Sequence, residues 1–161
     1  MKSIILFRHG MTESWDFGMD HVRPLSSRGI SDAKKIGLYL NRKNELPDLL
    51  ISSTALRAKT TAEMAMTWGK WTCALELDEG IYSGDLKFLL KLINNQNNSY
   101  SSICLVGHEP NISNFIARLT GDVHTRFSKG SMAKIDYDVN NWEDIAMGFG
   151  RLIWRIEPND I

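Results

Sequence analysis

Short apolar runs alternate with segments of helical periodicity along most of the chain, and this alternation constrains the fold more than any other feature. Short β-branched runs suit strands, whereas apolar residues at every third or fourth position suit helices that bury one face. We expect strands over residues 3–7, 49–52, 72–77 and 102–106. We expect helices over about residues 30–40, 56–68, 86–93 and 112–119, the first capped by Ser26 or Ser27. Repeated strand–helix units predict an α/β fold, a three-layer sandwich with a mainly parallel central sheet and helices on both faces.

The C-terminal part follows a different pattern. Two strand-like segments, 132–137 and 149–156, are joined by a polar loop rich in Asn, Asp and Gly. The earlier runs SIILF and SICLV are apolar throughout, which is typical of strands that are buried on both faces. A chain of 161 residues without a linker or an internal repeat fits one domain. We therefore predict a single domain over residues 1–161.

The charge balance limits the classes of partner. Lysine plus arginine and aspartate plus glutamate number 19 each, so no global basic field is present to collect nucleic acid. Any recognition of anions must be local. Cys73 and Cys104 lie in apolar runs and form no CxxC pair, so we expect buried thiols and no metal or redox cofactor.

Hydrophobic runs are too short for a membrane segment. The N-terminal apolar run SIILF is shorter than the roughly 7–15 residues of a signal peptide core. No stretch approaches the roughly 18 apolar residues of a membrane span. We expect a cytoplasmic protein without a membrane partner.

Basic and imidazole side chains follow three of the expected strands. The first strand ends in Arg8-His9-Gly10, Arg57 opens the helix after the second, and His108 follows the run SICLV. Because the carboxyl ends of parallel strands meet at one edge of a sheet, where α/β proteins bind ligands, we expect these side chains to converge. Taken singly, each has an ordinary role as a surface charge or a hydrogen-bonding histidine. Their shared position predicts a site.

These residue types suit phosphoryl transfer. Guanidinium groups keep their charge and can grip phosphate oxygens with two parallel hydrogen bonds. An imidazole nitrogen can attack phosphorus and form a phospho-histidine intermediate, while fixed donors stabilise the charge on the other oxygens. We expect His9 to be the nucleophile and Arg8, Arg57 and His108 to be the donors. Gly10 and Gly107, next to the two histidines, would let the backbone approach a ligand closely.

The motifs resemble those of a known family. RHG after the first strand, STALRAKTTA after the second and VGHEP after a later one are similar to the histidine phosphatase superfamily, over roughly residues 3–120. The segment DHVRPL with Gly29 resembles the small SixA-type phosphohistidine phosphatases. The resemblance implies a phosphoglycerate-mutase-like fold and the same roles for the four residues above, with Arg23 as a further phosphate ligand.

The chain departs from the mutase branch of that superfamily at one position and leaves the general acid open. Trp15 replaces an asparagine that follows RHG in that branch. Its general acid is a glutamate after the third strand, and Glu79 occupies a similar place, so Glu79 is our candidate acid, with Asp85 and Asp20 in reserve. The remaining possibility is that the site has no general acid. Of the other histidines, His21 follows RHG in a loop and could line the mouth of the site or serve an ordinary hydrogen-bonding role, and we expect His124 on the surface.

The short segment between Glu79 and His108 bears on the class of substrate. Glu79 and His108 lie only 29 positions apart, which leaves room for one short helix where larger relatives place lid segments. An open site suits a phosphoryl group displayed on a protein, so we expect a phosphohistidine-bearing protein as the substrate. A small-molecule phosphomonoesterase and a non-catalytic phosphate-binding module stay open, and so does the oligomeric state. A metallohydrolase is disfavoured, because no HxH, HxxxH or HExxH spacing occurs.

Overall fold

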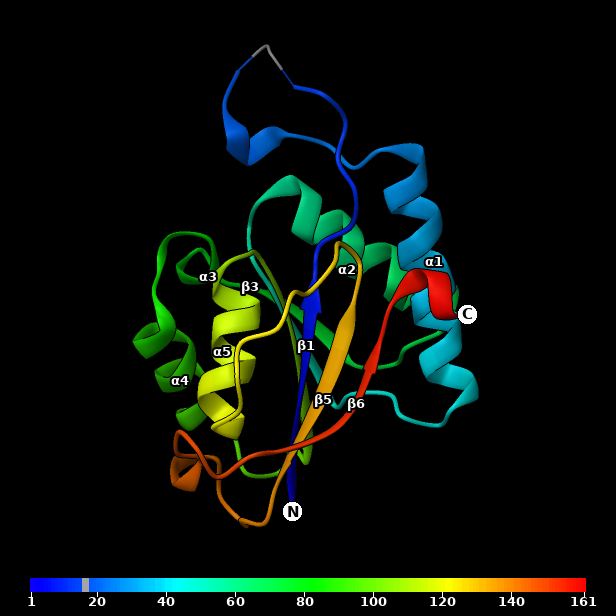
Figure 1. Cartoon of the computed structure of the whole chain (residues 1–161). Coiled ribbons are helices and arrows are strands. Elements are labelled where there is room, and N and C mark those ends of the chain that lie inside the picture. The colour runs from blue at the N-terminus through cyan, green and yellow to red at the C-terminus, as the bar shows by residue number, and fades with distance from the viewer. Residues whose placement is uncertain (16–17) are drawn as a thin grey trace.

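A computed structural model of the chain describes residues 1–15 and 18–161 and is built around one six-stranded sheet (Figure 1). The strands are β1 (Lys2–Arg8), β2 (Leu49–Ser52), β3 (Ala74–Leu77), β4 (Ser102–Gly107), β5 (Met132–Tyr137) and β6 (Arg151–Ile156). The helices are α1 (Ser27–Arg42), α2 (Leu56–Gly69), α3 (Gly80–Ser83), α4 (Leu86–Asn94) and α5 (Asn111–Thr120). Three short 3-10 turns are η1 (Asp20–Val22), η2 (Trp142–Asp144) and η3 (Pro158–Asp160).

The sheet is parallel on one side and antiparallel on the other. Its order is β3-β2-β4-β1-β5-β6, and β1 to β4 run parallel to one another. β5 pairs antiparallel with β1, and β6 pairs antiparallel with β5. This arrangement confirms the mainly parallel sheet and the change of pattern toward the C-terminus.

The order in which successive strands are placed across the sheet explains why helices cover both of its faces. The connections from β1 to β2 and from β2 to β3 move toward the β3 edge, whereas the connection from β3 to β4 moves back. Crossovers between parallel strands are right-handed, so a reversal of direction transfers the helices to the other face. One core cluster accordingly joins α1 and α2 to the sheet, and a second joins α4 and α5 to the opposite face. The predicted three-layer sandwich is confirmed (Figure 1).

Small residues bring α1 and α2 close together. A Cβ atom at Gly37 in α1 would lie 2.2 Å from the carbonyl oxygen of Ala65 in α2. Ala58 and Ala62 are also fully buried along α2. This packing holds the N-terminal end of α2, and hence Arg57, against the sheet.

The expected elements are present with small shifts of their ends. Ser26 is the N-cap of α1, and its hydroxyl accepts from the Gly29 N–H. β3 lies at the edge of the sheet and is mostly exposed. The turn η1 and the short helix α3 were not anticipated, and both carry residues that reach the site. No helix within the described ranges is long and apolar enough to cross a membrane.

Candidate active site

His9 is fixed by its own backbone at the carboxyl end of β1. Its N–H donates to the carbonyl of Gly107, the last residue of β4 (3.1 Å), and its carbonyl accepts from the N–H of Gly130, just before β5 (3.0 Å). The side chain is buried, at 8% exposure. His9 is therefore anchored between the strands on either side of β1, so its imidazole has a defined position.

The protonation of His9 is set by its surroundings. Its Nδ1 lies 2.8 Å from the carbonyl oxygen of Gly10, and since a carbonyl can only accept, Nδ1 carries the hydrogen. Burial is the largest cause that lowers the His9 pKa, to about 3, and the positive charges of Arg57 and Arg8 act in the same direction. The ring is thus neutral at pH 7, with the lone pair on Nε2. A neutral imidazole with a free Nε2 has the form that a nucleophile needs.

Gly10 packs closely against the start of α1. A Cβ at Gly10 would lie 3.0 Å from the carbonyl oxygen of Gly29, and one at Gly29 would lie 2.1 Å from the carbonyl oxygen of Met11. The Gly10 N–H donates to the Thr61 hydroxyl, which in turn donates to the Arg57 carbonyl. The two glycines let the segment after β1 pass close to α1.

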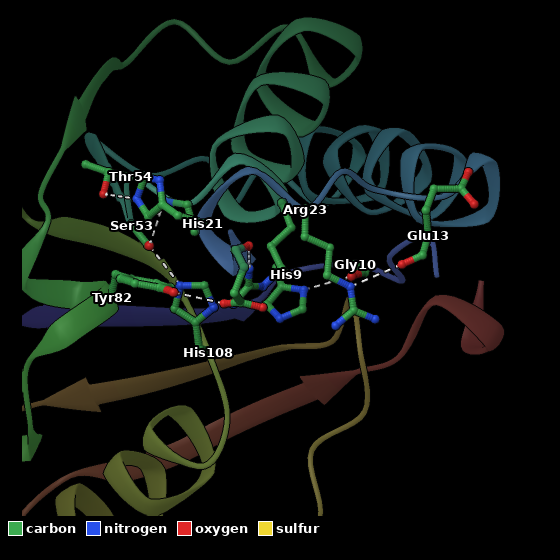
Figure 2. Close-up of polar contacts among 12 residues, drawn as sticks. His9, Gly10, Glu13, His21, Arg23, Ser53, Thr54, Tyr82 and His108 are labelled. Atoms are coloured by element: carbon green, nitrogen blue, oxygen red, sulfur yellow. Dashed lines mark hydrogen bonds and ion pairs between the residues drawn. The ribbon is translucent and has the colours of Figure 1, made fainter. Parts of the chain in front are cut away.

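His108 lies beside His9 at the end of β4. The two ring centroids are 5.2 Å apart (Figure 2). His108 Nε2 is 2.8 Å from Ser53 Oγ, which also accepts from the Ala55 N–H. Ser53 Oγ can donate to a bare Nε2 or accept from a protonated one, so this contact is compatible with both tautomers of His108. His108 Nδ1 is buried and has no partner among the described residues, and in the tautomer that carries the hydrogen on Nδ1 it can donate to a substrate oxygen.

Arg57 is brought to the site by α2, but its donors are occupied. Its Nη2 donates to Asp20 Oδ2 (2.9 Å) and its Nη1 to the Asp20 carbonyl (2.9 Å). Arg57 is buried, whereas the Asp20 side chain is 53% exposed. Asp20 therefore holds two of the donors that the sequence assigns to a phosphate, one through its carboxylate and one through its backbone carbonyl.

Tyr82 was missed by the sequence analysis. It comes from α3, and its hydroxyl donates to Asp20 Oδ2 (2.9 Å) (Figure 2). That hydrogen bond is the first of the causes that lower the Asp20 pKa; the Arg57 charge adds to it. The Tyr82 ring packs edge-on against both His108 (5.5 Å) and His21 (4.9 Å). Nothing in the sequence around Tyr82 distinguishes it from a surface tyrosine.

His21 lies at the site, which the sequence left as one of two alternatives. Its Nε2 is 2.9 Å from Thr54 Oγ1 at the end of β2. Together with Asp20, it fastens η1 to the ends of β2 and α3 (Figure 2). His124, in contrast, is exposed and bonds to Ser113, as expected of a surface histidine.

Arg8 and Arg23 approach the site from its other side. Arg8 Nη1 donates to the Phe127 carbonyl (2.8 Å), and its Nε is buried with no partner in the described part of the chain. Burial lowers the Arg8 pKa. Arg23 Nε donates to the Glu13 carbonyl (3.1 Å), and the Arg23 charge contributes to the low pKa of Asp20. Both guanidiniums thus keep donors available.

The candidate acids differ in their contacts. Glu79 is exposed at the N-terminus of α3, and no hydrogen bond or ion pair joins its carboxylate to any described site residue. Asp85 caps α4 by accepting from the Phe88 N–H (3.0 Å). Of the three candidates, only Asp20 contacts Arg57. Within residues 1–15 and 18–161, no three His, Cys, Asp or Glu side chains are grouped to hold a metal ion.

Both buried imidazoles should make stability depend on pH. In the unfolded chain they take up protons below about pH 6.5, but burial lowers the folded pKa of His108 to about 4 and that of His9 to about 3. The unfolded state binds more protons in that window, so the free energy of unfolding falls as the pH drops from about 6.5 toward 4. Urea unfolding at pH 7 and at pH 5 measures this effect. The free energy of unfolding should fall more between the two pH values in wild type than in a His9→Gln/His108→Gln protein. Equal losses in the two proteins would contradict the prediction.

Comparison with known proteins shows the family and the fold of the chain. The profile of the histidine phosphatase superfamily (branch 1) matches residues 4–84. A candidate phosphohistidine phosphatase SixA of Agrobacterium tumefaciens has a TM-score of 0.83 and 22% identity, with 98% of each chain covered. The protein histidine phosphatase SixA in complex with tungstate has a TM-score of 0.82 and 22% identity, also with 98% of each chain covered. An uncharacterised protein of Arabidopsis thaliana is 26% identical over 97% of this chain and 76% of its own.

Proposed function

Because the chain belongs to the histidine phosphatase superfamily, we propose that it is a phosphohistidine phosphatase in which His9 carries the phosphoryl group between substrate and water. Membership of the superfamily supports a phosphatase in general. The observation that carries the finer proposal is the state of His9, a buried neutral imidazole whose Nδ1–H is held by Gly10. Its Nε2 keeps a lone pair at neutral pH, next to two arginines and a second histidine.

The residues have the following roles in the reaction. His9 Nε2 attacks phosphorus, the bond from phosphorus to the leaving group breaks, and the enzyme holds a phospho-histidine. Arg8, Arg57 and His108 donate to the phosphoryl oxygens as charge shifts onto them. Water then attacks the phospho-histidine, which releases inorganic phosphate and restores His9. Arg23 is a further donor for the phosphate.

Substrate binding on this scheme displaces Asp20 from Arg57. The Asp20 carboxylate and a phosphoryl group are both anions with oxygens that accept from the same Nη2 donor. η1 is held over the site by side-chain contacts of Asp20 and His21 rather than by a long helix. We infer that this short turn moves aside when a phosphoryl group enters.

The choice of a phosphohistidine rests on the weak support for a general acid. A P–N bond to imidazole breaks with less protonation than an alkyl ester needs, because the imidazole is a better leaving group than an alkoxide. Glu79 has no contact that would hold it near a leaving group, and Asp85 is engaged as a helix cap. Asp20 lies in the site, but the Tyr82 hydrogen bond and Arg57 lower its pKa, so its carboxylate has no proton to give at neutral pH. The direct test is to quench wild type during turnover and map the acid-labile phosphate by mass spectrometry. Label on a residue other than His9 would overturn the proposal.

Replacement of Glu79 by glutamine should change the rate of phosphohistidine hydrolysis little. General acid catalysis is typically worth about a hundred- to ten-thousandfold. Glu79→Gln should keep its rate within about threefold on phosphohistidine and on nitrophenyl phosphate, and wild type should be slow on alkyl phosphates, because no acid serves them. The measurement is kcat/KM for three substrates with two proteins, with Glu76→Gln as the matched exposed control. A large loss confined to alkyl phosphates would assign the acid to Glu79 and favour a phosphomonoesterase.

A further inference from the structure

A surface cavity of about 340 Å³ adjoins the active site at Arg8. It lies between the first turn of α1, the segment of residues 126–129 and the C-terminal turn η3. Arg8 is the one residue of the phosphate-binding set that lines it. The cavity therefore extends from the phosphate-binding residues toward a region that the proposed chemistry does not use.

Cations outnumber anions in the lining of this cavity. Arg8, Arg28, Arg126 and Lys129 face two acids, Asp32 and Glu157. Both acids are already engaged: Asp32 accepts from Arg28 Nε (3.1 Å), and the Glu157 side chain caps η3. The remaining positive charge is not balanced by the lining.

Three of the four cations keep donors for a ligand. Arg28 is held by Asp32 and by Asn159 Oδ1 (2.9 Å). Among the described residues, the Arg8 side chain donates only from Nη1, to the Phe127 carbonyl (2.8 Å), and no hydrogen bond or ion pair engages the side chains of Arg126 or Lys129. The segment that carries Arg126 is held against β6. Arg155 of β6 donates to the backbone carbonyl of Arg126 and to the hydroxyl of Thr125.

We propose that this cavity is a second anion subsite, which binds a carboxylate or a further phosphate that the substrate carries close to the phosphoryl group taken by His9. The proposal deepens the function proposed above and rests on it for the identity of the group that His9 takes. Arg8 links the two positions, since it belongs to the phosphate set and lines the cavity. An acidic residue beside a phosphohistidine supplies such an anion.

Binding to an inactive protein tests the subsite apart from the chemistry. Three peptides would carry a stable phosphoryl-triazole analogue of phosphohistidine next to glutamine, glutamate or phosphoserine. Their Kd values would be measured with His9→Ala protein, with the same protein bearing Arg126→Gln and Lys129→Gln, and with a control bearing Arg42→Gln and Lys91→Gln. The control removes two exposed charges from α1 and α4, away from the cavity.

The glutamate and phosphoserine peptides should bind about fivefold more tightly than the glutamine peptide at low salt, and the gain should shrink as salt is added. The gain should vanish with Arg126→Gln/Lys129→Gln and persist in the control. The ratio of the two acidic peptides identifies whether a carboxylate or a phosphate fits better. Equal Kd values for all three peptides, or a gain that survives loss of Arg126 and Lys129, would overturn the subsite. Failure of wild type to hydrolyse any phosphohistidine peptide would instead overturn the proposed function.

Discussion

His9→Ala protein is expected to lose at least about 10⁴-fold in kcat/KM, because removal of a nucleophile takes away the covalent route and leaves only binding and electrostatic stabilisation. The loss should be the same on phosphohistidine and on nitrophenyl phosphate, since both substrates transfer their phosphoryl group to the same nitrogen. Acid-labile labelling of the protein should disappear together with turnover. Rates and labelling would be measured on the same preparations.

His124→Ala is the matched control for this experiment. It removes an imidazole from an exposed loop, where the only described contact is with Ser113, and activity should stay near wild type. Circular dichroism should show that both variants are folded, because His9 is held mainly by its backbone hydrogen bonds to Gly107 and Gly130. Substantial turnover by folded His9→Ala protein would exclude a covalent intermediate at this position.

The scaffold of the site could be predicted from the sequence because it depends on local patterns. β1 and β4 are continuous apolar runs, and a strand buried on both faces has this composition. Residues that directly follow such strands must lie at the edge of the sheet, which is why His9 and His108 could be placed together. Arg57 could be placed with them because the helix pattern after β2 begins at that point.

The side chains that contact Arg57 and Asp20 in the site could not be predicted in the same way. The contact of Asp20 with Arg57 depends on the path of a segment that lies between elements, where no periodic pattern fixes the backbone. Tyr82 reaches Asp20 only because Gly80–Ser83 form a helical turn. That turn also leaves Glu79 exposed, and the sequence alone does not show that Tyr82, rather than Glu79, contacts Asp20.

The second large effect is expected for Arg57→Lys, which keeps the positive charge but replaces a planar guanidinium by a single ammonium. Lysine cannot make the two parallel hydrogen bonds that arginine offers to a phosphate. Loss of one fixed donor to a charge that develops in the transition state costs roughly 3–4 kcal/mol, or about a hundred- to a thousandfold in kcat. Arg42→Lys, at the exposed end of α1, is the matched control and should be neutral.

Arg57 also binds Asp20, so the loss in Arg57→Lys has two possible origins that a double-mutant cycle separates. If Arg57 acts directly on the phosphoryl group, Asp20→Ala alone should keep kcat near wild type and lower KM, because it frees the donors that a phosphate requires. The double variant should then show the full kcat loss of Arg57→Lys. If Arg57 serves only to hold Asp20, Asp20→Ala should reproduce the kcat loss by itself, and the double variant should lose nothing more. That second outcome, measured on phosphohistidine and nitrophenyl phosphate alike, would remove Arg57 from the phosphate-binding set and make Asp20 the residue through which it acts.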